Sequence, residues 1–360
     1  METQERKRIP VAVLGATGMV GQRFIELLQD HPWFELVGLG ASEKHNGRPY
    51  AEVTAWRLTG SDMPVGAAQM PVVACTPEAL PDVKVVFSAL PGEIAGEIEQ
   101  AFAQAGVAVF SNAKNYRMAP DVPLLIPEVN ANHIAAVAQQ RKQRGWPGFI
   151  ITNANCATTP LVMALKPLQL AFGVTKVLIT TLQSISGAGY PGLPSYDILD
   201  NAIPYISGEE EKLECETQKM LGEWREGQGF VDAPIVVSAH CNRVATREAH
   251  LECASIELGR NDVSPEEIIA AWENYRPASQ QAQLPTAPEH TLIYRHELDR
   301  PQTLRDRDAG HGMTVTLGRL RRCPILSYKF VMLGHNTIRG AAGGSILNAE
   351  WCVQQGLLPL

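Results

Sequence analysis

Cys156 stands in the segment FIITNANCATTPL, residues 149–161, where a short apolar run gives way to a helix. The run predicts a strand, the Asn-Ala-Asn that follows predicts a tight turn, and Pro160 suits a first helical turn, where its missing N–H leaves no bond unmade. A thiol at a helix N-terminus lies near unpaired backbone N–H groups and the positive end of the helix dipole. Both stabilise a thiolate, the reactive form of cysteine. We therefore interpret Cys156 as a nucleophile, although a lone cysteine is more often a buried structural residue.

Four further residues have side chains that can do chemistry. His250 precedes an alternating strand and is a candidate acid or base. Arg117 lies in a polar loop, where its cation can bind an oxyanion. Glu209 and Lys212 share one face of a helix that we expect to begin after Ser207, its predicted cap. Taken singly, each has an ordinary alternative: a lone histidine, a surface cation or a surface ion pair.

The N-terminal part predicts a dinucleotide-binding unit. Residues 11–14 predict a strand, GATGMVG follows at 15–21, and Val20, Phe24, Leu27 and Leu28 then recur at helical spacing. The glycines form GxxGxxG and not GxGxxG, but either turn brings backbone N–H groups and a helix dipole to a pyrophosphate. A plain glycine turn is the alternative.

The second predicted strand, Glu35–Ala41, favours NADP over NAD as the cofactor. An NAD site usually places Asp or Glu at the end of this strand, where it binds the ribose hydroxyls. Here Ser42 and Lys44 follow, with Arg48 nearby, and a hydroxyl beside cations suits a 2′-phosphate. Glu43 opposes this interpretation, and a solvated loop is the alternative.

Alternation of strands and helices predicts an α/β fold with two domains. Strands at 83–91 and 107–110, with a helix at about 93–106 between them, predict a Rossmann-like, doubly wound parallel sheet. Strands rich in β-branched residues predict an α+β domain with a mixed sheet in the second half; they lie at 174–182, 235–239, 251–258, 315–320 and 327–333. We place the first domain at 1–153, completed by a helix within about 336–360, and the second at 154–335.

Composition argues for a cytoplasmic enzyme. A net charge of −7 disfavours nucleic acid or an anionic membrane as the main partner. Seven cysteines without a CxxC pair indicate a reducing compartment, and the group His240, Cys241, His250 and Cys253 lacks the usual zinc spacing. Residues 1–10 are charged and predict no secretory signal, and no run of 18 apolar residues predicts a membrane span.

As an ordered set, these segments resemble the aspartate-β-semialdehyde dehydrogenases, particularly their archaeal and fungal branch, over nearly the whole chain. The matching segments are Gly15–Gly21, Asp121–Asn130, Asn153–Thr158, Gln183–Gly189, Gly208–Lys212, Cys241–Arg243 with His250, and Gly334–Asn336. Many members have a proline where Ala154 stands here.

The resemblance implies the role of each site residue. Cys156 would be the thioester-forming nucleophile, His250 the acid/base and Gln183 the residue that positions the thioacyl intermediate. The substrate carboxylate would bind Arg243, its ammonium Glu209, and its phosphate Lys212 and Arg117. The predicted NADP contacts are Gly15, Thr17, Gly18, Met19, Val20, Ser42, Lys44, Ser88, Gly187 and Asn336.

The implied reaction reduces 4-phospho-L-aspartate to L-aspartate 4-semialdehyde with NADPH, in the pathway to lysine, threonine and methionine. It needs no metal, its partners are small molecules, and we expect a homodimer or homotetramer. Malonyl-CoA reductase is one alternative, because it uses the same thioester chemistry. Glu209 argues against it, since malonyl has no ammonium, unless Glu209 pairs with Lys212. A non-catalytic dinucleotide-binding or sensor protein is the second alternative.

Overall fold

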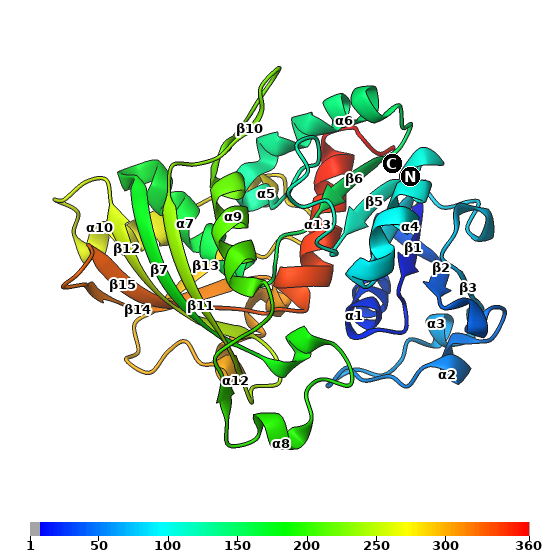
Figure 1. Cartoon of the computed structure of the whole chain (residues 1–360), viewed down its shortest axis with the longest axis horizontal. Coiled ribbons are helices and arrows are strands. Elements are labelled where there is room, and N and C mark those ends of the chain that lie inside the picture. The colour runs from blue at the N-terminus through cyan, green and yellow to red at the C-terminus, as the bar shows by residue number, and fades with distance from the viewer. Residues whose placement is uncertain (1–7, 360) are drawn as a thin grey trace, which may run out of the picture.

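The computed structural model describes residues 8–359, which form two halves, each built on its own β-sheet (Figure 1). Residues 1–7 lie outside this range, and with them most of the segment for which we predict no secretory signal. Within residues 8–359, every helix falls short of the length and apolar character that a bilayer crossing demands.

The sheet of the first half is parallel and has the strand order β3-β2-β1-β4-β5-β6. This is the order of a doubly wound dinucleotide-binding sheet, whose ligand crevice lies at the carboxyl ends of the two central strands. The predicted Rossmann-like fold is therefore confirmed. The strands are β1 (Ile9–Leu14), β2 (Phe34–Ala41), β3 (Val72–Ala74), β4 (Val85–Ser88), β5 (Ala108–Ser111) and β6 (Phe149–Thr152).

Helices cover both faces of this sheet, because alternate strand residues point to opposite sides. On one face Val11 packs in a cluster with Phe24 of α1 and Ile346 of α13, and on the other Ala12 packs with Phe102 of α4. The last helix of the chain thus returns to the N-terminal sheet. The helices of this half are α1 (Met19–Leu28), α2 (Tyr50–Val53), α3 (Val65–Gln69), α4 (Gly92–Gln104), α5 (Pro127–Asn130), α6 (Ala136–Arg144) and α13 (Gly343–Gln354).

The second half contains the predicted mixed sheet, with the order β13-β14-β15-β12-β7-β11-β8. The pairs β7 with β11 and β13 with β14 are parallel, and the other pairs are antiparallel. A short hairpin, β9 (Glu223–Arg225) and β10 (Gly229–Val231), projects beyond it (Figure 1). The strands are β7 (Val174–Gln183), β8 (Ala202–Ile203), β11 (Val236–Val244), β12 (His250–Leu258), β13 (Leu292–Arg295), β14 (Val315–Arg322) and β15 (Tyr328–Gly334).

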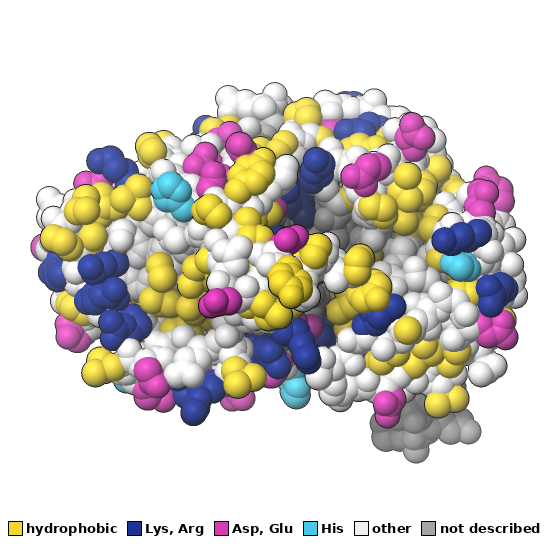
Figure 2. All heavy atoms as spheres, turned by 60° about the horizontal axis from the view of Figure 1, so that its bottom comes forward, with side chains coloured by type: hydrophobic (Ala, Val, Ile, Leu, Met, Phe, Trp, Pro, Cys, Tyr) yellow, Lys and Arg dark blue, Asp and Glu magenta, His cyan; other side chains and the backbone are white. Residues whose placement is uncertain are grey.

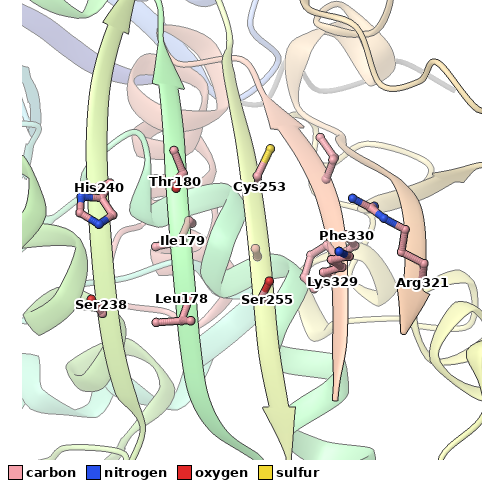
Figure 3. A pocket seen from close by; sticks show the side chains of 12 residues that line it. Leu178, Ile179, Thr180, Ser238, His240, Cys253, Ser255, Arg321, Lys329 and Phe330 are labelled. Atoms are coloured by element: carbon pink, nitrogen blue, oxygen red, sulfur yellow. The ribbon is translucent and has the colours of Figure 1, made fainter. Parts of the chain in front are cut away.

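One face of the mixed sheet is covered by helices, and the other presents side chains outward. Leu161, Leu213 and Trp272, from α7, α9 and α10, share one apolar cluster with the covered face. On the other face, Figure 3 shows Leu178, Thr180, Ser238, His240, Cys253 and Ser255 in adjacent rows, lining a shallow pocket. The helices of this half are α7 (Thr158–Phe172), α8 (Ser195–Ile198), α9 (Glu209–Leu221), α10 (Pro265–Glu273), α11 (Ala278–Gln281) and α12 (Thr303–Asp306).

Three local predictions need correction. β11 runs to Val244, so Cys241 and Arg243 lie in a strand and not after it, and His250 is the first residue of β12. The N-cap of α9 is Gly208, whose φ of 65° lies in the left-handed region. No side chain among residues 8–359 forms a capping hydrogen bond to α9, so the prediction of Ser207 as the cap is wrong.

Candidate active site

Cys156 and His250 meet where the two halves of the molecule join. Cys156 lies between the end of β6 and the start of α7, and its Sγ is 3.1 Å from Nε2 of His250, the first residue of β12. Pro160 falls in the first turn of α7, as predicted. The nucleophile and the acid/base that we expected from the sequence are therefore in direct contact, although 94 residues separate them.

The hydrogen bonds of the His250 ring determine where its proton lies. The backbone N–H of Ser184 donates to Nδ1 at 3.1 Å, and a backbone N–H can only donate. Nδ1 must then carry a lone pair, so the neutral ring holds its proton on Nε2, the atom that faces Cys156. In the neutral state His250 thus presents an N–H donor to the sulfur.

Strand register places Arg243, Gln183 and His250 in one row across three strands. Arg243 of β11 is paired with Gln183 of β7, and β12 runs antiparallel to β7 so that His250 comes next in the row. All three side chains are buried, with at most 6% exposed. Arg243 donates from Nη1 to the backbone oxygen of Ser184 at 2.6 Å. One row of the sheet thus brings together a cation, an amide and an imidazole.

A second polar row lies directly behind the first and was not predicted. Cys241, Thr181 and Glu252 are paired across the same three strands, and all are buried. Neither carboxyl oxygen of Glu252 has a hydrogen-bond partner within residues 8–359, and burial raises its pKa well above the usual value. Burial therefore favours the neutral form of Glu252.

Glu209 lies at the start of α9, close to the nucleophile turn. Its carboxylate accepts hydrogen bonds from Asn155 Nδ2 at 2.9 and 3.0 Å and from Lys212 Nζ at 2.8 Å. Burial alone would raise the pKa of Glu209, but Lys212 and Asn155 outweigh it and hold the pKa below its usual value. Glu209 thus forms the ion pair with Lys212 that the sequence analysis gave as an alternative to substrate binding.

Glu216 and Lys219 complete the same face of α9, and sequence reasoning missed both. Glu216 accepts from Arg117 Nη1 at 2.9 Å and from the Asn155 backbone N–H at 2.7 Å. Lys219 donates to three backbone oxygens of residues 117–122. The helical spacing of Glu209, Lys212, Glu216 and Lys219 was the available signal. Through it, α9 positions both the Arg117 loop and the nucleophile turn.

Two glycines allow the backbone to come close to the catalytic pair. A Cβ on Gly340, in the π-helix Ile338–Ala342, would lie 2.7 Å from the Cβ of Cys156. A Cβ on Gly187 would lie 2.8 Å from Arg243 Nη1 and 3.5 Å from Cε1 of His250. Larger residues at either position would displace catalytic side chains.

The predicted thiolate stabilisation at the helix start is not found in the unliganded site. Burial raises the pKa of the Cys156 thiol to about 12, and Glu209 adds to the rise against Arg117 and Arg243. Burial, aided by Arg243, lowers the pKa of His250 to about 3. The first free N–H groups of the turn, at Ala157 and Thr158, donate to Asn155 Oδ1 and not to the sulfur. The resting pair is a thiol beside a neutral imidazole.

The turn between β1 and α1 fits a dinucleotide. Gly15 has a φ of 76°, and a Cβ on it would lie 2.7 Å from the Ala89 oxygen, while a Cβ on Gly21 would lie 2.2 Å from the Gly15 oxygen. These contacts leave the tight turn open only to glycine. Thr17, Gly18, Met19 and Val20 keep partial or full exposure where α1 begins, so its free N–H groups can reach a pyrophosphate.

The other predicted cofactor residues have different settings. Ser42 and Lys44 are exposed just beyond the end of β2, beside the glycine turn. Ser88 must be corrected: its side chain is fully buried, so its hydroxyl cannot reach a surface ligand, and its backbone oxygen accepts hydrogen bonds from Asn112. Asn336 uses its amide within the protein, accepting from the Ala249 N–H and donating to Ser186 Oγ.

The surface is hollowed between the two halves, with Lys and Arg side chains at the edge of the hollow (Figure 2). The first half is a parallel sheet of dinucleotide-binding order, and the mixed sheet of the second half brings a histidine into contact with a cysteine. These features define the class as a two-domain protein with a dinucleotide-binding fold and a thiol where the two halves join.

Family models match both halves, and the chain belongs to the semialdehyde dehydrogenase family. The semialdehyde dehydrogenase NAD binding domain matches residues 10–137, and the semialdehyde dehydrogenase dimerisation domain matches residues 165–339.

Relatives of known name agree with the predicted resemblance. Aspartate-semialdehyde dehydrogenase of Archaeoglobus fulgidus is 49% identical, covering 98% of this chain and 100% of the relative, and that of Schizosaccharomyces pombe is 45% identical, covering 97% and 99%. A crystal structure of the Candida albicans aspartate semialdehyde dehydrogenase with NADP has a TM-score of 0.89 at 44% identity and covers 98% of this chain and 100% of that one. The predicted resemblance to archaeal and fungal members is confirmed.

The pKa of Cys156 gives a test of the resting state. In the unliganded protein, alkylation of Cys156 by iodoacetamide should be slow at neutral pH and rise about tenfold per pH unit well into the alkaline range, because only the thiolate reacts and its pKa is about 12. The rate is followed on the Cys156 peptide by mass spectrometry.

Cys323 provides an internal comparison in the same sample. Although burial acts against it, hydrogen bonds from the backbone N–H groups of Leu326 and Ile325 hold its pKa below the usual value, so its rate should level off at lower pH. A Cys156 rate that levels off near neutral pH would show instead a resting thiolate–imidazolium pair.

Proposed function

We propose that this protein is an aspartate-semialdehyde dehydrogenase, which reduces 4-phospho-L-aspartate to L-aspartate 4-semialdehyde with NADPH and releases phosphate. The reaction belongs to the pathway from aspartate to lysine, threonine and methionine. The observation that carries the proposal is the 3.1 Å contact between Cys156 Sγ and His250 Nε2, beside a dinucleotide-binding sheet in a chain with relatives of that name.

The chemistry divides between Cys156 and His250. The Cys156 sulfur attacks the acyl carbon and its S–H bond breaks; the phosphate leaves with that proton, and a thioester joins the substrate to the sulfur. NADPH, when bound, would supply the hydride that the thioester carbon accepts. The Nε2–H of His250 then protonates the developing oxyanion and recovers that proton when the aldehyde is released. Gln183, next to His250 in the same row, orients the thioacyl group.

Burial leaves the thiol protonated at rest, so we propose that the substrate helps to activate it. Glu209 is the largest contributor after burial to the raised pKa of Cys156. A substrate ammonium bound to Glu209 would offset that negative charge, and the pKa of the thiol would fall. Activation would thus follow binding of the correct amino acid, which also limits reaction with other electrophiles.

Each charged group of the substrate would bind a different residue or pair of residues. We assign the α-carboxylate to Arg243, the ammonium to Glu209, and the phosphate to Arg117 and Lys212. Arg243 lies in the row of His250, and Arg117 is held toward the nucleophile turn by Glu216. A planar guanidinium suits both carboxylate and phosphate, since it can donate two parallel hydrogen bonds.

Malonyl-CoA reduction is the comparison reaction. The Glu209–Lys212 ion pair weakens the charge argument against it, because a paired Glu209 would repel a malonyl group less. The names of the relatives do not favour it.

We propose that NADP binds across the glycine turn, with its 2′-phosphate near Ser42 and Lys44, and with Gly187 and Asn336 near the reacting end.

We keep the predicted domain division, with 1–153 and about 336–360 in the first domain and 154–335 in the second. The packing of α13 on the first sheet supports it. A homodimer or homotetramer would bury the open face of the mixed sheet, where Leu178 and Val236 are 45% and 63% exposed (Figure 3). A reactive thiol suits a cytoplasmic location.

The proposed function is tested by turnover of aspartate semialdehyde with phosphate and NADP, followed by NADPH absorbance, beside turnover of malonyl-CoA with NADPH. We expect turnover with the first set alone. Cys156→Ser should lower it by about a thousandfold or more while NADPH binding persists, because a serine hydroxyl has almost no ionised fraction. Activity of Cys156→Ser within about tenfold of wild type would refute the nucleophile.

Cofactor choice should depend on the charge beyond β2. We expect a higher kcat/KM with NADPH than with NADH, and Lys44→Glu should narrow the difference, since a carboxylate repels the 2′-phosphate. Lys84→Glu is the matched control, because Lys84 is also exposed but lies at the amino end of β4. Equal use of the two cofactors by the wild type would contradict the assignment.

The two arginines should affect different substrates. A charge-assisted contact contributes about 1.5–3 kcal/mol, so Arg117→Ala should raise the KM for phosphate by roughly ten- to a hundredfold, and Arg243→Ala that for aspartate semialdehyde. Arg247→Ala, an exposed arginine four residues beyond Arg243, should change neither KM. If Arg117→Ala left the KM for phosphate unchanged, the phosphate assignment would fail.

A further inference from the structure

A buried charge cluster joins the two halves of the molecule beside His250. Arg23 of α1 donates from Nη2 to Glu248 Oε1 at 3.1 Å, and His335 Nε2 lies 3.4 Å from Glu248 Oε2. All three are nearly inaccessible, with exposures of 6%, 7% and 1%. Arg23 belongs to α1, which packs on the parallel sheet, whereas Glu248 lies two residues before β12 and His335 directly follows β15. Nothing in the proposed reaction uses them.

The cluster has a fixed hydrogen-bond direction. The backbone N–H of Ile338 donates to Nδ1 of His335 at 3.3 Å, so the neutral ring carries its proton on Nε2 and donates it to Glu248. Burial alone would raise the pKa of Glu248, but His335 and Arg23 outweigh burial and lower it to about 2. Glu248 is therefore a carboxylate wherever the enzyme would be assayed, and it accepts from both neighbours.

The cluster holds the residue that sets the direction of His250. Ala249, between Glu248 and His250, has a φ of 75°, in the left-handed region that a residue with a Cβ rarely adopts. Its N–H donates to Asn336 Oδ1 at 2.8 Å, and Asn336 donates in turn to Ser186 Oγ at 2.8 Å. Such a conformation persists only where its surroundings determine it, and here Glu248 and Asn336 do so from either side.

The same helix connects the cluster to the glycine turn. α1 begins directly after Gly18, and Gln22, next to Arg23, binds the backbone of Ala55 and Arg57 through its side chain. We infer that Arg23, Glu248 and His335 are positioning residues that direct His250 at Cys156 from the cofactor-binding helix. The inference rests on the proposed function. On this inference, the orientation of His250 depends on α1, whose first turn would hold the cofactor.

Glu248→Gln and Arg23→Met remove the charges at little change in size. Each should lower kcat by about ten- to a hundredfold, as a misdirected catalytic group does, with the KM values for aspartate semialdehyde and phosphate changed by less than about threefold. Arg23→Lys should recover part of the loss. The double variant should lose no more than either single variant, because the two residues act as one unit.

Asp121→Asn is the matched control. Asp121 is a buried acid that binds Arg144 of α6, so its loss also removes an ion pair, but one that includes none of Arg23, Glu248, His335, Cys156 and His250. It should lower the denaturation midpoint as Glu248→Gln does and leave kcat unchanged. The inference is overturned if Glu248→Gln keeps the wild-type kcat, if Asp121→Asn loses as much, or if the losses in the double variant multiply.

A second readout does not depend on turnover. A misdirected His250 no longer donates to the Cys156 sulfur, so alkylation of Cys156 by iodoacetamide at fixed alkaline pH should slow by about tenfold in Glu248→Gln and Arg23→Met. Asp121→Asn should react as the wild type does. If the wild type fails to turn over aspartate semialdehyde while alkylation slows as expected, the proposed function fails and the positioning role stands. Unchanged alkylation in Glu248→Gln overturns that role.

Discussion

The rest of the site depends on the contact between the Cys156 sulfur and the His250 imidazole, because two distant segments must supply it. Cys156 arrives at the end of the parallel sheet, and His250 begins a strand of the mixed sheet. Their approach requires the π-helix backbone at Gly340 to lie against Cys156, and it requires Ala249 in a left-handed conformation that costs about 1–3 kcal/mol. The packing of the domain junction has to meet that cost.

Paired buried charges are what make this junction specific. Glu209, Glu216 and Glu248 are all buried, and each binds a cation and a further hydrogen-bond donor. Loss of one member of a buried pair leaves an uncompensated charge and typically costs about 3–5 kcal/mol. Lys212 shares α9 with Glu209, but every other partner lies in a different element from its glutamate, so only the native arrangement of α1, α9 and the turn before α7 satisfies all of them. The site is thereby ordered before a substrate binds.

Local signals in the sequence were sufficient to predict the fold and to single out Cys156 and His250, which the structure places in contact. The glycine turn at 15–21 and the alternation of strands and helices predicted the first sheet, and the polar turn before Pro160 marked Cys156. The end of β11 was missed because Cys241 and Arg243 are polar residues on a buried face, which breaks the expected pattern of a strand. Glu216, Glu248 and His335 were missed because their partners lie far away in the sequence. The pKa of Cys156 depends on burial by several segments, which a local pattern does not report.

Glu252 shows that burial can limit the negative charge near Cys156. Its carboxyl is buried behind His250 without a hydrogen-bond partner in the described chain, and a negative charge there is one of the causes that raise the pKa of Cys156. The carboxylate of Glu209 already raises the pKa of Cys156, so a second carboxylate would oppose formation of the thiolate. Burial without a hydrogen-bond donor raises the pKa of Glu252 and so favours its neutral form. The mixed sheet thus places the carboxyl of Glu252 near Cys156 without a hydrogen-bond partner in the described chain, which favours the neutral form of Glu252.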